Sequence, residues 1–298
     1  MDVGARSHAS LAPKTSAADA TATPHMDALV IQGGRKLQGR VTVSGAKNAA
    51  LPVMAATLLA PGTHTLRNVP ALADTRTMAR VMEQLGAKIE FKDHVCRIDT
   101  TRITSLEAPY DLVRTMRASV YVLGPMLARF GAARVSLPGG CAWGPRPVNL
   151  HLEGLDAMGA HLEIDHGYIV GNDVKLKGAR IHHETVSVGA TAQIMMAATL
   201  AEGTTVIEGA ALEPDITVLG QVLIACGANV EGLGTRTITV HGVKTLTPID
   251  TTIIPHRIEA ATFLAAVAIT GGSVTLERCE PAHLAATIEK LSEAGCDI

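Results

Sequence analysis

The stretch MAATLLAPGTHTL, residues 54–66, returns as MAATLAEGTTVI at residues 196–207. Weaker copies run from residues 123–131 into 133–137 and from residues 263–270 into 273–276. Each copy has the pattern of a helix rich in Ala and Leu, a glycine that stops it, and a strand of β-branched residues. The repeated stretch therefore predicts an α/β fold built from similar units.

A second motif follows each copy, with a glycine between a helical run and a strand-like run. It reads QLGAKI at residues 84–89, AMGAHL at 157–162, ACGANV at 225–230 and EAGCDI at 293–298. The glycine predicts a helix C-cap. Both motifs recur about every 70 residues, which predicts four copies of a two-helix, multi-strand unit that share a core. The fourth copy stops at Ile298 inside its predicted strand, so we expect a fragment or completion by another segment or chain.

Composition narrows the class of protein. The 298 residues carry a net charge of −2, which gives no footprint of nucleic acid or of an anionic membrane. No uninterrupted apolar run reaches the roughly 18 residues of a membrane helix. Residues 1–25 lack the apolar centre of a signal peptide and are predicted to be a disordered extension, with a targeting sequence as the alternative. These features favour a soluble, cytoplasmic protein, and we expect no metal and no cofactor.

One of the five cysteines differs from the others in its surroundings. Cys141 lies in the loop sequence LPGGCAWGPRP, residues 137–147, with Arg146 five residues later. Glycine and proline predict an exposed loop, and a nearby cation lowers a thiol pKa, so this cysteine is a candidate nucleophile or proton donor. The other four cysteines are interpreted as packing residues: Cys96, Cys226, Cys279 and Cys296. No two of them have the C-x-x-C spacing of a zinc or redox site.

Four motifs in order resemble those of the enolpyruvyl transferases, over about residues 28–298. They are VSGAKNAALP at 43–52, APYDLVRTMRAS at 108–119, the Cys141 loop through His151, and VSVGAT at 186–191. The resemblance implies two lobes, each an inside-out α/β barrel of three units with helices inside and sheets outside. It assigns residues 26–47 to the first strand of the second lobe, 48–255 to a complete first lobe of three repeats, and 256–298 to a truncated start of the second lobe.

The resemblance also implies an activity. Members that act on UDP-N-acetylglucosamine transfer the enolpyruvyl group of phosphoenolpyruvate to its 3-hydroxyl and release phosphate by addition and elimination, in the first committed step of peptidoglycan synthesis. The expected partners are these two small molecules, with no nucleic acid and no membrane, and the complete protein is expected to be a monomer. Because the family's catalytic Asp lies in the second lobe beyond Ile298, this chain alone is expected to be inactive.

Site residues follow from the same resemblance. Cys141 would protonate C3 of phosphoenolpyruvate, form a covalent adduct with it and react with fosfomycin, and its loop would close as a lid. Lys47, Asn48 and Arg146 would bind phosphoenolpyruvate, and Lys47 also stands where a loop enters a helix, a favourable place for an anion. The expected contacts to UDP-N-acetylglucosamine are Arg117, Arg146, Pro147, Val148, Asn149, Leu150, Val186, Ser187, Val188 and Gly189.

Three positions depart from the family pattern. Asn149 stands where Asp is usual, Thr185 where Lys is usual, and His256 where Asp is usual in the sequence Pro-Asp-Arg-Ile-Glu. The loss of one charged contact to phosphate costs about 1.5 to 3 kcal/mol, so we expect weaker nucleotide binding. His256 introduces a group that titrates near neutral pH.

Three hypotheses stay open from the sequence. The chain is part of a working UDP-N-acetylglucosamine enolpyruvyl transferase, or of the shikimate-pathway enolpyruvyl transferase, which lacks the cysteine loop. Alternatively, it is an inactive paralogue or a truncated module that binds nucleotide. Thr185, Asn149 and His256 support the inactive form, whereas four intact residues argue against it: Lys47, Arg117, Cys141 and Arg146.

Overall fold

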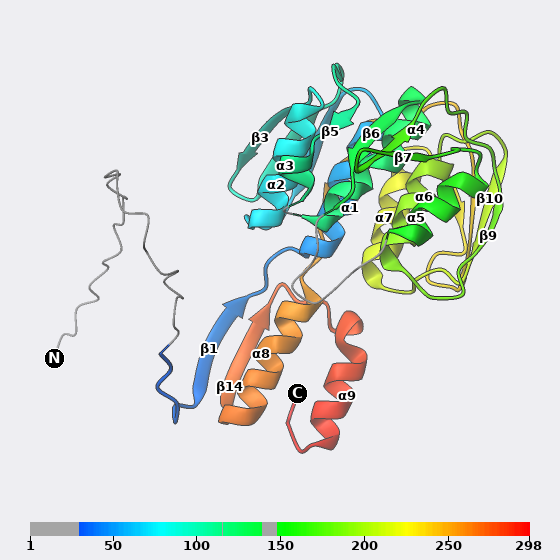
Figure 1. Cartoon of the computed structure of the whole chain (residues 1–298). Helices are drawn as coiled ribbons and strands as arrows, with labels where there is room; N and C mark the ends of the chain where they lie inside the picture. The colour runs from blue at the N-terminus through cyan, green and yellow to red at the C-terminus, as the bar shows by residue number, and fades with distance from the viewer. Residues whose placement is uncertain (1–29, 115, 139–147) are drawn as a thin grey trace, which may run out of the picture. The chain divides into compact units, whose positions relative to one another are not determined.

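The computed structural model describes residues 30–114, 116–138 and 148–298. Residues Lys36–Ile298 form one compact unit, and the elements below belong to it. The predicted extension, residues 1–25, lies outside the described residues. Figure 1 shows the chain with its elements labelled.

The described residues form helices interspersed with short strands. The helices are α1 Lys47–Ala56, α2 Ala73–Gln84, α3 Tyr110–Val113, α4 Leu123–Phe130, α5 Asn149–Ala157, α6 Val188–Ala198, α7 Pro214–Ala225, α8 Arg257–Thr270 and α9 Ala285–Glu293, with 3-10 helices η1 Thr57–Leu59, η2 Arg117–Val122 and η3 Pro281–Leu284. The strands are β1 Leu37–Thr42, β2 Thr63–Arg67, β3 Lys88–Lys92, β4 Val95–Asp99, β5 Glu107–Ala108, β6 Ala133–Ser136, β7 Glu163–Asp165, β8 Tyr168–Gly171, β9 Arg180–His182, β10 Thr204–Glu208, β11 Asn229–Glu231, β12 Thr237–His241, β13 Asp250–Thr252 and β14 Gly272–Glu277.

Three four-stranded sheets share one strand order. They read β13-β2-β4-β3, β5-β6-β8-β7 and β9-β10-β12-β11, and in each the first pair is parallel and the other two pairs are antiparallel. The parallel edge strand always comes from the neighbouring unit. Strand β5 follows the first unit and joins the second, β9 follows the second and joins the third, and β13 follows the third and returns to the first. The three repeats are therefore linked in a cycle by strand exchange.

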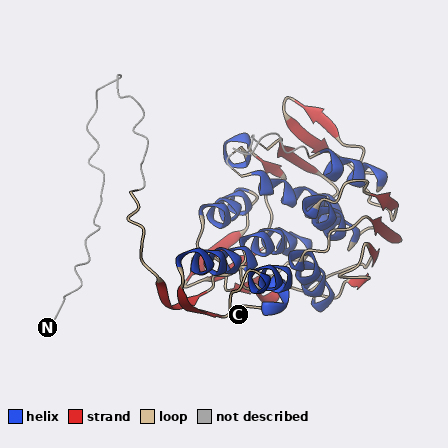
Figure 2. Ribbon diagram, turned by 90° about the horizontal axis from the view of Figure 1, so that it is seen from below, coloured by secondary structure: helices blue, strands red, loops and turns tan. Residues whose placement is uncertain are grey.

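Two helices are buried on nearly all sides. In α1 eight of the ten residues are buried, and in α6 nine of the eleven are. A helix that is apolar around its whole circumference needs protein on every side, which is why the repeats share one core. Figure 2 shows the helices gathered inside and the strands outside them. The predicted α/β fold with internal helices is confirmed, although the described strands form separate sheets and no continuous barrel wall.

The predicted glycine C-caps have the backbone conformation that requires glycine. Gly86, Gly159, Gly227 and Gly295 follow α2, α5, α7 and α9, and their φ angles are 105°, 87°, 101° and 95°. Residues with a Cβ rarely adopt positive φ, so these four positions end their helices as the second motif predicts.

The fourth copy has its helices but a smaller sheet. Strand β1 pairs in parallel with β14, as β13 does with β2, and α8 and α9 follow the repeat. Residues 294–298 form no strand, so the strand predicted around Ile298 is wrong for this structure. A strand needs a neighbour for its backbone hydrogen bonds, and β14 has only β1 beside it among the described residues. We propose, as the sequence predicts, that β1 and residues 256–298 belong to a second lobe.

Two chain segments cross just before α1 and α8. Gly45 and Pro255 form an antiparallel bridge, flanked by hydrogen bonds of 2.8 Å from the Ala46 amide to the Ile254 carbonyl and from the His256 amide to the Ser44 carbonyl. A Cβ on Gly45 would overlap the carbonyl oxygen of Asn68, so glycine is required there. The crossing sets the starting points of both helices.

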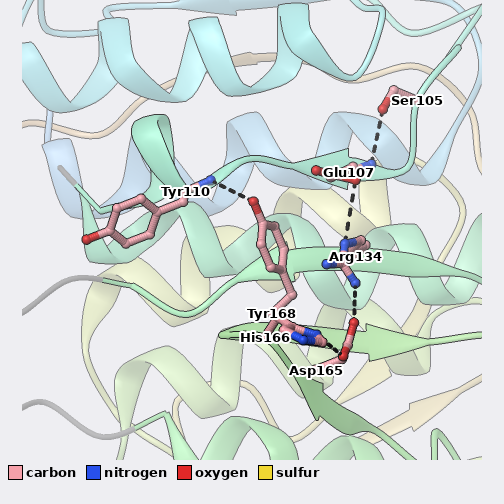
Figure 3. A network of polar contacts seen from close by, with 7 residues as sticks. All are labelled: Ser105, Glu107, Tyr110, Arg134, Asp165, His166 and Tyr168. Atoms are coloured by element: carbon pink, nitrogen blue, oxygen red, sulfur yellow. Dashed lines mark hydrogen bonds and ion pairs between the residues drawn. The ribbon is translucent and has the colours of Figure 1, made fainter.

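A polar network on the second sheet holds the short helix α3 (Figure 3). Arg134 lies 3.0 Å from Asp165 and 3.6 Å from Glu107, and its guanidinium lies 4.1 Å from the centroid of the Tyr168 ring. The Tyr168 hydroxyl accepts a hydrogen bond of 3.3 Å from the Tyr110 amide at the start of α3. The network thereby ties the sheet to the segment that leads into η2.

A buried histidine joins three backbone segments. His64 Nδ1 accepts a hydrogen bond of 2.9 Å from the Ile249 amide, and Nε2 lies 2.9 Å from Thr100 Oγ1 and 3.2 Å from the Ala60 carbonyl oxygen. Burial lowers the pKa of His64 to about 4, because the neutral ring is preferred away from water. The neutral ring therefore contributes to stability at neutral pH.

We expect the His64→Gln variant to show a weaker loss of stability in acid than the wild type. In the unfolded chain His64 binds a proton below about pH 6.5, whereas the folded chain resists this until about pH 4. The free energy of unfolding should therefore fall as the pH drops from about 6.5 towards 4, and less so without this ring. Urea unfolding at pH 7 and pH 5 measures the difference, and equal pH dependence in both proteins would contradict the assignment.

Candidate anion-binding site

A cavity of about 440 Å³ lies at the start of α1, η2 and α6. Its lining combines four cationic side chains, three carboxylates, a tyrosine and a histidine. The residues are Lys47, Asn48, Leu51, Asp74, Arg114, Met116, Arg117, Ala118, Val120, Tyr121, His151, Val188, Gly189, Glu213, Asp215 and Arg257.

Five of the residues predicted from the sequence meet in this cavity. Lys47 and Asn48 open α1, Arg117 is the first residue of η2, and Val188 and Gly189 open α6. They come from three segments that lie far apart in the sequence. Their convergence places two cations and a helix N-terminus around one space.

Other predicted residues lie elsewhere. Val148 and Leu150 pack in or against the core, and Val186 is exposed. Asn149 donates a hydrogen bond of 3.1 Å to Glu153 on the exposed side of α5, and Ser187 caps α6 by accepting from the Ala190 amide at 3.2 Å. None of these five lines the cavity. The predicted residues Cys141, Arg146 and Pro147 lie outside the described residues.

Lys47 forms an ion pair, although its neighbours in the sequence, Gly45 to Ala50, carry no charge. Its Nζ lies 2.7 Å from Asp74 Oδ2, and each side chain is about one-third exposed, at 36% and 34%. Asp74 stands in the first turn of α2, where the helix dipole favours a negative charge. An anion that binds Lys47 therefore meets a carboxylate already beside it.

The first turn of α6 faces the same cavity through Val188 and Gly189. The first amides of a helix have no partner within the helix and attract anions. The Ser187 side chain satisfies the amide of Ala190. The remaining amides at this end are suited to phosphate or carboxylate oxygens.

The start of α8 supplies a second ion pair to the cavity. Arg257 Nη2 lies 3.5 Å from Oδ2 of Asp215, a nearly buried carboxylate at the start of α7. His256 precedes it, and burial lowers its pKa although Glu259 and Asp215 oppose that shift. The pKa of His256 is therefore shifted downward from the ordinary histidine value, because the ring is partly withdrawn from water.

Several cavity residues have no signal in the sequence motifs. Asp74, Glu213 and Asp215 come from segments that show only ordinary helix starts, and their approach depends on the tertiary fold. Arg257 lies in the Pro-His-Arg-Ile-Glu stretch that matches a family motif, but no contact is predicted for it from the sequence. His151 offers one usable signal, since it is a polar ring between two leucines in a helical stretch.

Two searches of the described residues give negative results. No group of three or more His, Cys, Asp and Glu side chains is arranged to hold a metal ion. No helix in this part of the chain has the length and apolar character needed to cross a membrane.

The sequence model of the family described as EPSP synthase (3-phosphoshikimate 1-carboxyvinyltransferase) matches residues 31–298. The chain belongs to the EPSP synthase family.

Several curated proteins that are similar to this chain carry one name. The chain is 56% identical over 273 residues to a UDP-N-acetylglucosamine 1-carboxyvinyltransferase of Geotalea daltonii and 54% identical to that of Geobacter metallireducens. A third, from Myxococcus xanthus, is 51% identical. Each match covers 92% of this chain and 66% of the relative, so the chain spans just under two thirds of their length.

Two solved structures share the fold of this chain. The enolpyruvyl transferase NikO from Streptomyces tendae superimposes with a TM-score of 0.79 at 25% identity, covering 89% of this chain and 64% of that one. EPSP synthase from Acinetobacter baumannii superimposes with a TM-score of 0.72 at 22% identity, covering 89% of this chain and 61% of that one. The predicted enolpyruvyl transferase fold is confirmed.

We expect Asp74→Asn to strengthen binding of inorganic phosphate at low salt. The substitution removes one negative charge next to Lys47, and a partly exposed pair of this kind is worth at most about 1 kcal/mol, or about fivefold in affinity. Titration calorimetry at low and high salt measures the gain, which salt should reduce. Asp250→Asn breaks an ion pair with Arg67 outside the cavity and serves as the control. Weaker phosphate binding in Asp74→Asn would show that Asp74 orients Lys47 instead of competing for it.

Proposed function

We propose that the complete protein transfers the enolpyruvyl group of phosphoenolpyruvate to the 3-hydroxyl of UDP-N-acetylglucosamine and releases phosphate. The observation that carries the proposal is the meeting of Lys47, Asn48, Arg117, Val188 and Gly189 around one cavity. Relatives at 51–56% identity bear the name of this transferase. Cations and helix amides suit a reaction in which both substrates are anions.

The proposed reaction has two stages. The sugar hydroxyl adds through its oxygen to C2 of phosphoenolpyruvate, its proton passes to a base, and an acid places a proton on C3. Elimination then removes a proton from C3 and phosphate from C2, which leaves the enol ether. Lys47 would hold the phosphoryl or carboxylate group, with Asn48 beside it, and Arg146 would supply a further cation. The other contacts to UDP-N-acetylglucosamine that the sequence predicts are also part of this proposal.

Cys141 is our proposed acid for C3, and three of the four described cysteines support that choice by contrast. Burial raises the pKa of Cys96 to about 12 and also raises the pKa of Cys226 and Cys279. A thiol with a raised pKa holds its proton more tightly, so it is a weaker acid and also forms less of the nucleophilic thiolate. We propose a different setting for Cys141, with Arg146 close by in the sequence.

The cellular setting belongs to the same proposal. We place the reaction in the cytoplasm, at the first committed step of peptidoglycan synthesis, with a monomeric protein and no nucleic-acid or membrane partner. The decisive assay is phosphate release by the complete protein. Release only when phosphoenolpyruvate and UDP-N-acetylglucosamine are both present supports the proposal. Release with shikimate 3-phosphate in place of the sugar nucleotide would assign the shikimate-pathway reaction instead.

Arg117→Ala tests the cavity directly in the 298-residue chain. We expect UDP-N-acetylglucosamine to bind the variant about tenfold to a hundredfold more weakly, since a charge-assisted contact is worth about 1.5 to 3 kcal/mol. Titration calorimetry provides the affinity, and thermal unfolding checks that the variant is folded. Arg40→Ala is the control. Arg40 lies on the exposed strand β1, pairs with Glu277 on β14 and does not line the cavity. Equal affinity in Arg117→Ala and the wild type would contradict the proposed contact.

Fosfomycin tests the thiol. We expect the epoxide to be opened by the Cys141 sulfur, so that peptide mass spectrometry finds the intact added mass on the peptide that contains residues 137–147. Cys141→Ser should give no adduct, and the buried Cys96 serves as an internal control in the same sample. Modification of Cys96 with none at Cys141 would refute the assignment.

A further inference from the structure

His151 is buried without hydrogen bonds. The residue is 2% exposed, and neither Nδ1 nor Nε2 has a hydrogen-bond partner in the described part of the chain. Burying an unpaired polar group lowers stability, so most buried imidazoles are bonded. His64 shows the usual solution, since it is also fully buried and its two nitrogens contact Ile249, Thr100 and Ala60. The contrast sets His151 apart from a structural histidine.

The ring of His151 lies against the first turn of α6. A Cβ built on Gly189 would come within 2.7 Å of His151 Nε2 and 3.7 Å of the Tyr121 hydroxyl oxygen. The ring thus occupies space that only a glycine leaves free. His151, Gly189 and Tyr121 all line the cavity, so the unpaired ring and the helix N-terminus face the same space.

The ring is neutral in the folded chain. Burial lowers the pKa of His151 to about 3, and the positive charge of Arg117 and the nearby ring of His183 shift it in the same direction. A neutral imidazole carries one N–H donor and one nitrogen acceptor. It can therefore donate to a phosphoryl oxygen or accept from a hydroxyl without competing as a charge with Arg117. Arg117 Nε is also buried without a partner in the described residues.

We propose that His151 positions a ligand by a hydrogen bond at the first turn of α6, with a phosphoryl or hydroxyl oxygen as the group that it contacts. The proposal deepens the proposed function and rests on it for the identity of the ligand as a sugar nucleotide. His151 acts as a positioning residue: the helix amides and Arg117 attract the anion, and the imidazole fixes its orientation. Its unpaired nitrogens in the free chain are satisfied only when the ligand binds.

The first experiment measures the ligand-free chain. His151→Phe removes two unpaired polar atoms and keeps a ring of similar size, so its thermal midpoint should equal or exceed that of the wild type. His64→Gln disturbs a bonded ring at equal burial and should lower the midpoint. A midpoint of His151→Phe as low as that of His64→Gln would overturn the proposal, whatever the ligand is.

The second experiment measures binding to the 298-residue chain with UDP-N-acetylglucosamine and with inorganic pyrophosphate as probes. Loss of one hydrogen bond should weaken binding roughly tenfold in His151→Phe. His151→Gln retains a donor and an acceptor and should recover part of that loss, whereas His64→Gln should bind as the wild type does. Equal affinity of His151→Phe and the wild type overturns the role of His151.

The two proposals fail in different ways. A wild-type chain that binds pyrophosphate but not UDP-N-acetylglucosamine overturns the proposed function, and the effect of His151→Phe on pyrophosphate then decides the role of His151. A wild-type chain that binds neither probe overturns both. A wild-type chain that binds the sugar nucleotide, with no loss in His151→Phe, overturns the positioning role alone.

Discussion

The crossing of Gly45 and Pro255 is the contact on which the site depends. Backbone hydrogen bonds on either side fix two segments that are separated by three complete repeats. Helix α1 begins two residues after one segment and α8 two residues after the other, so Lys47 and Arg257 are each the first residue of a helix. Both side chains enter one cavity for that reason. A small backbone pairing thereby brings together cations that the sequence separates by about two hundred residues.

The core around that crossing follows from helices that cannot face water. Since α1 and α6 are buried on almost every side, each needs neighbours that its own repeat does not supply. Strand exchange provides them, because β5, β9 and β13 each complete the sheet of the next unit in a cycle. The three repeats consequently form one structure, and their helix starts can meet at a common site.

The cavity is lined by polar groups, and some of them have no hydrogen-bond partner in the described residues of the ligand-free chain. Lys47 pairs with Asp74 and Arg257 with Asp215, whereas His151 and Arg117 Nε have no partner in the described residues. A core chosen for stability alone would replace such a histidine by an apolar side chain. The difference between the paired His64 and the unpaired His151 separates a residue that holds the fold from one that serves a ligand.

Local signals in the sequence determined most of the fold. Glycines such as Gly86 and Gly227 permit the positive φ angle with which a helix ends, and apolar periodicity indicates helices that need a core, so the repeated units were predictable. The strand expected at Ile298 was not, because a strand depends on a partner and not on its own residues alone. The family motifs propose Lys47, Arg117 and Gly189 as site residues, and the structure brings the three to one cavity. The placing of Asp74, Asp215 and Arg257 beside them was decided only by the tertiary structure, since charge pairing and burial arise from segments that meet after folding.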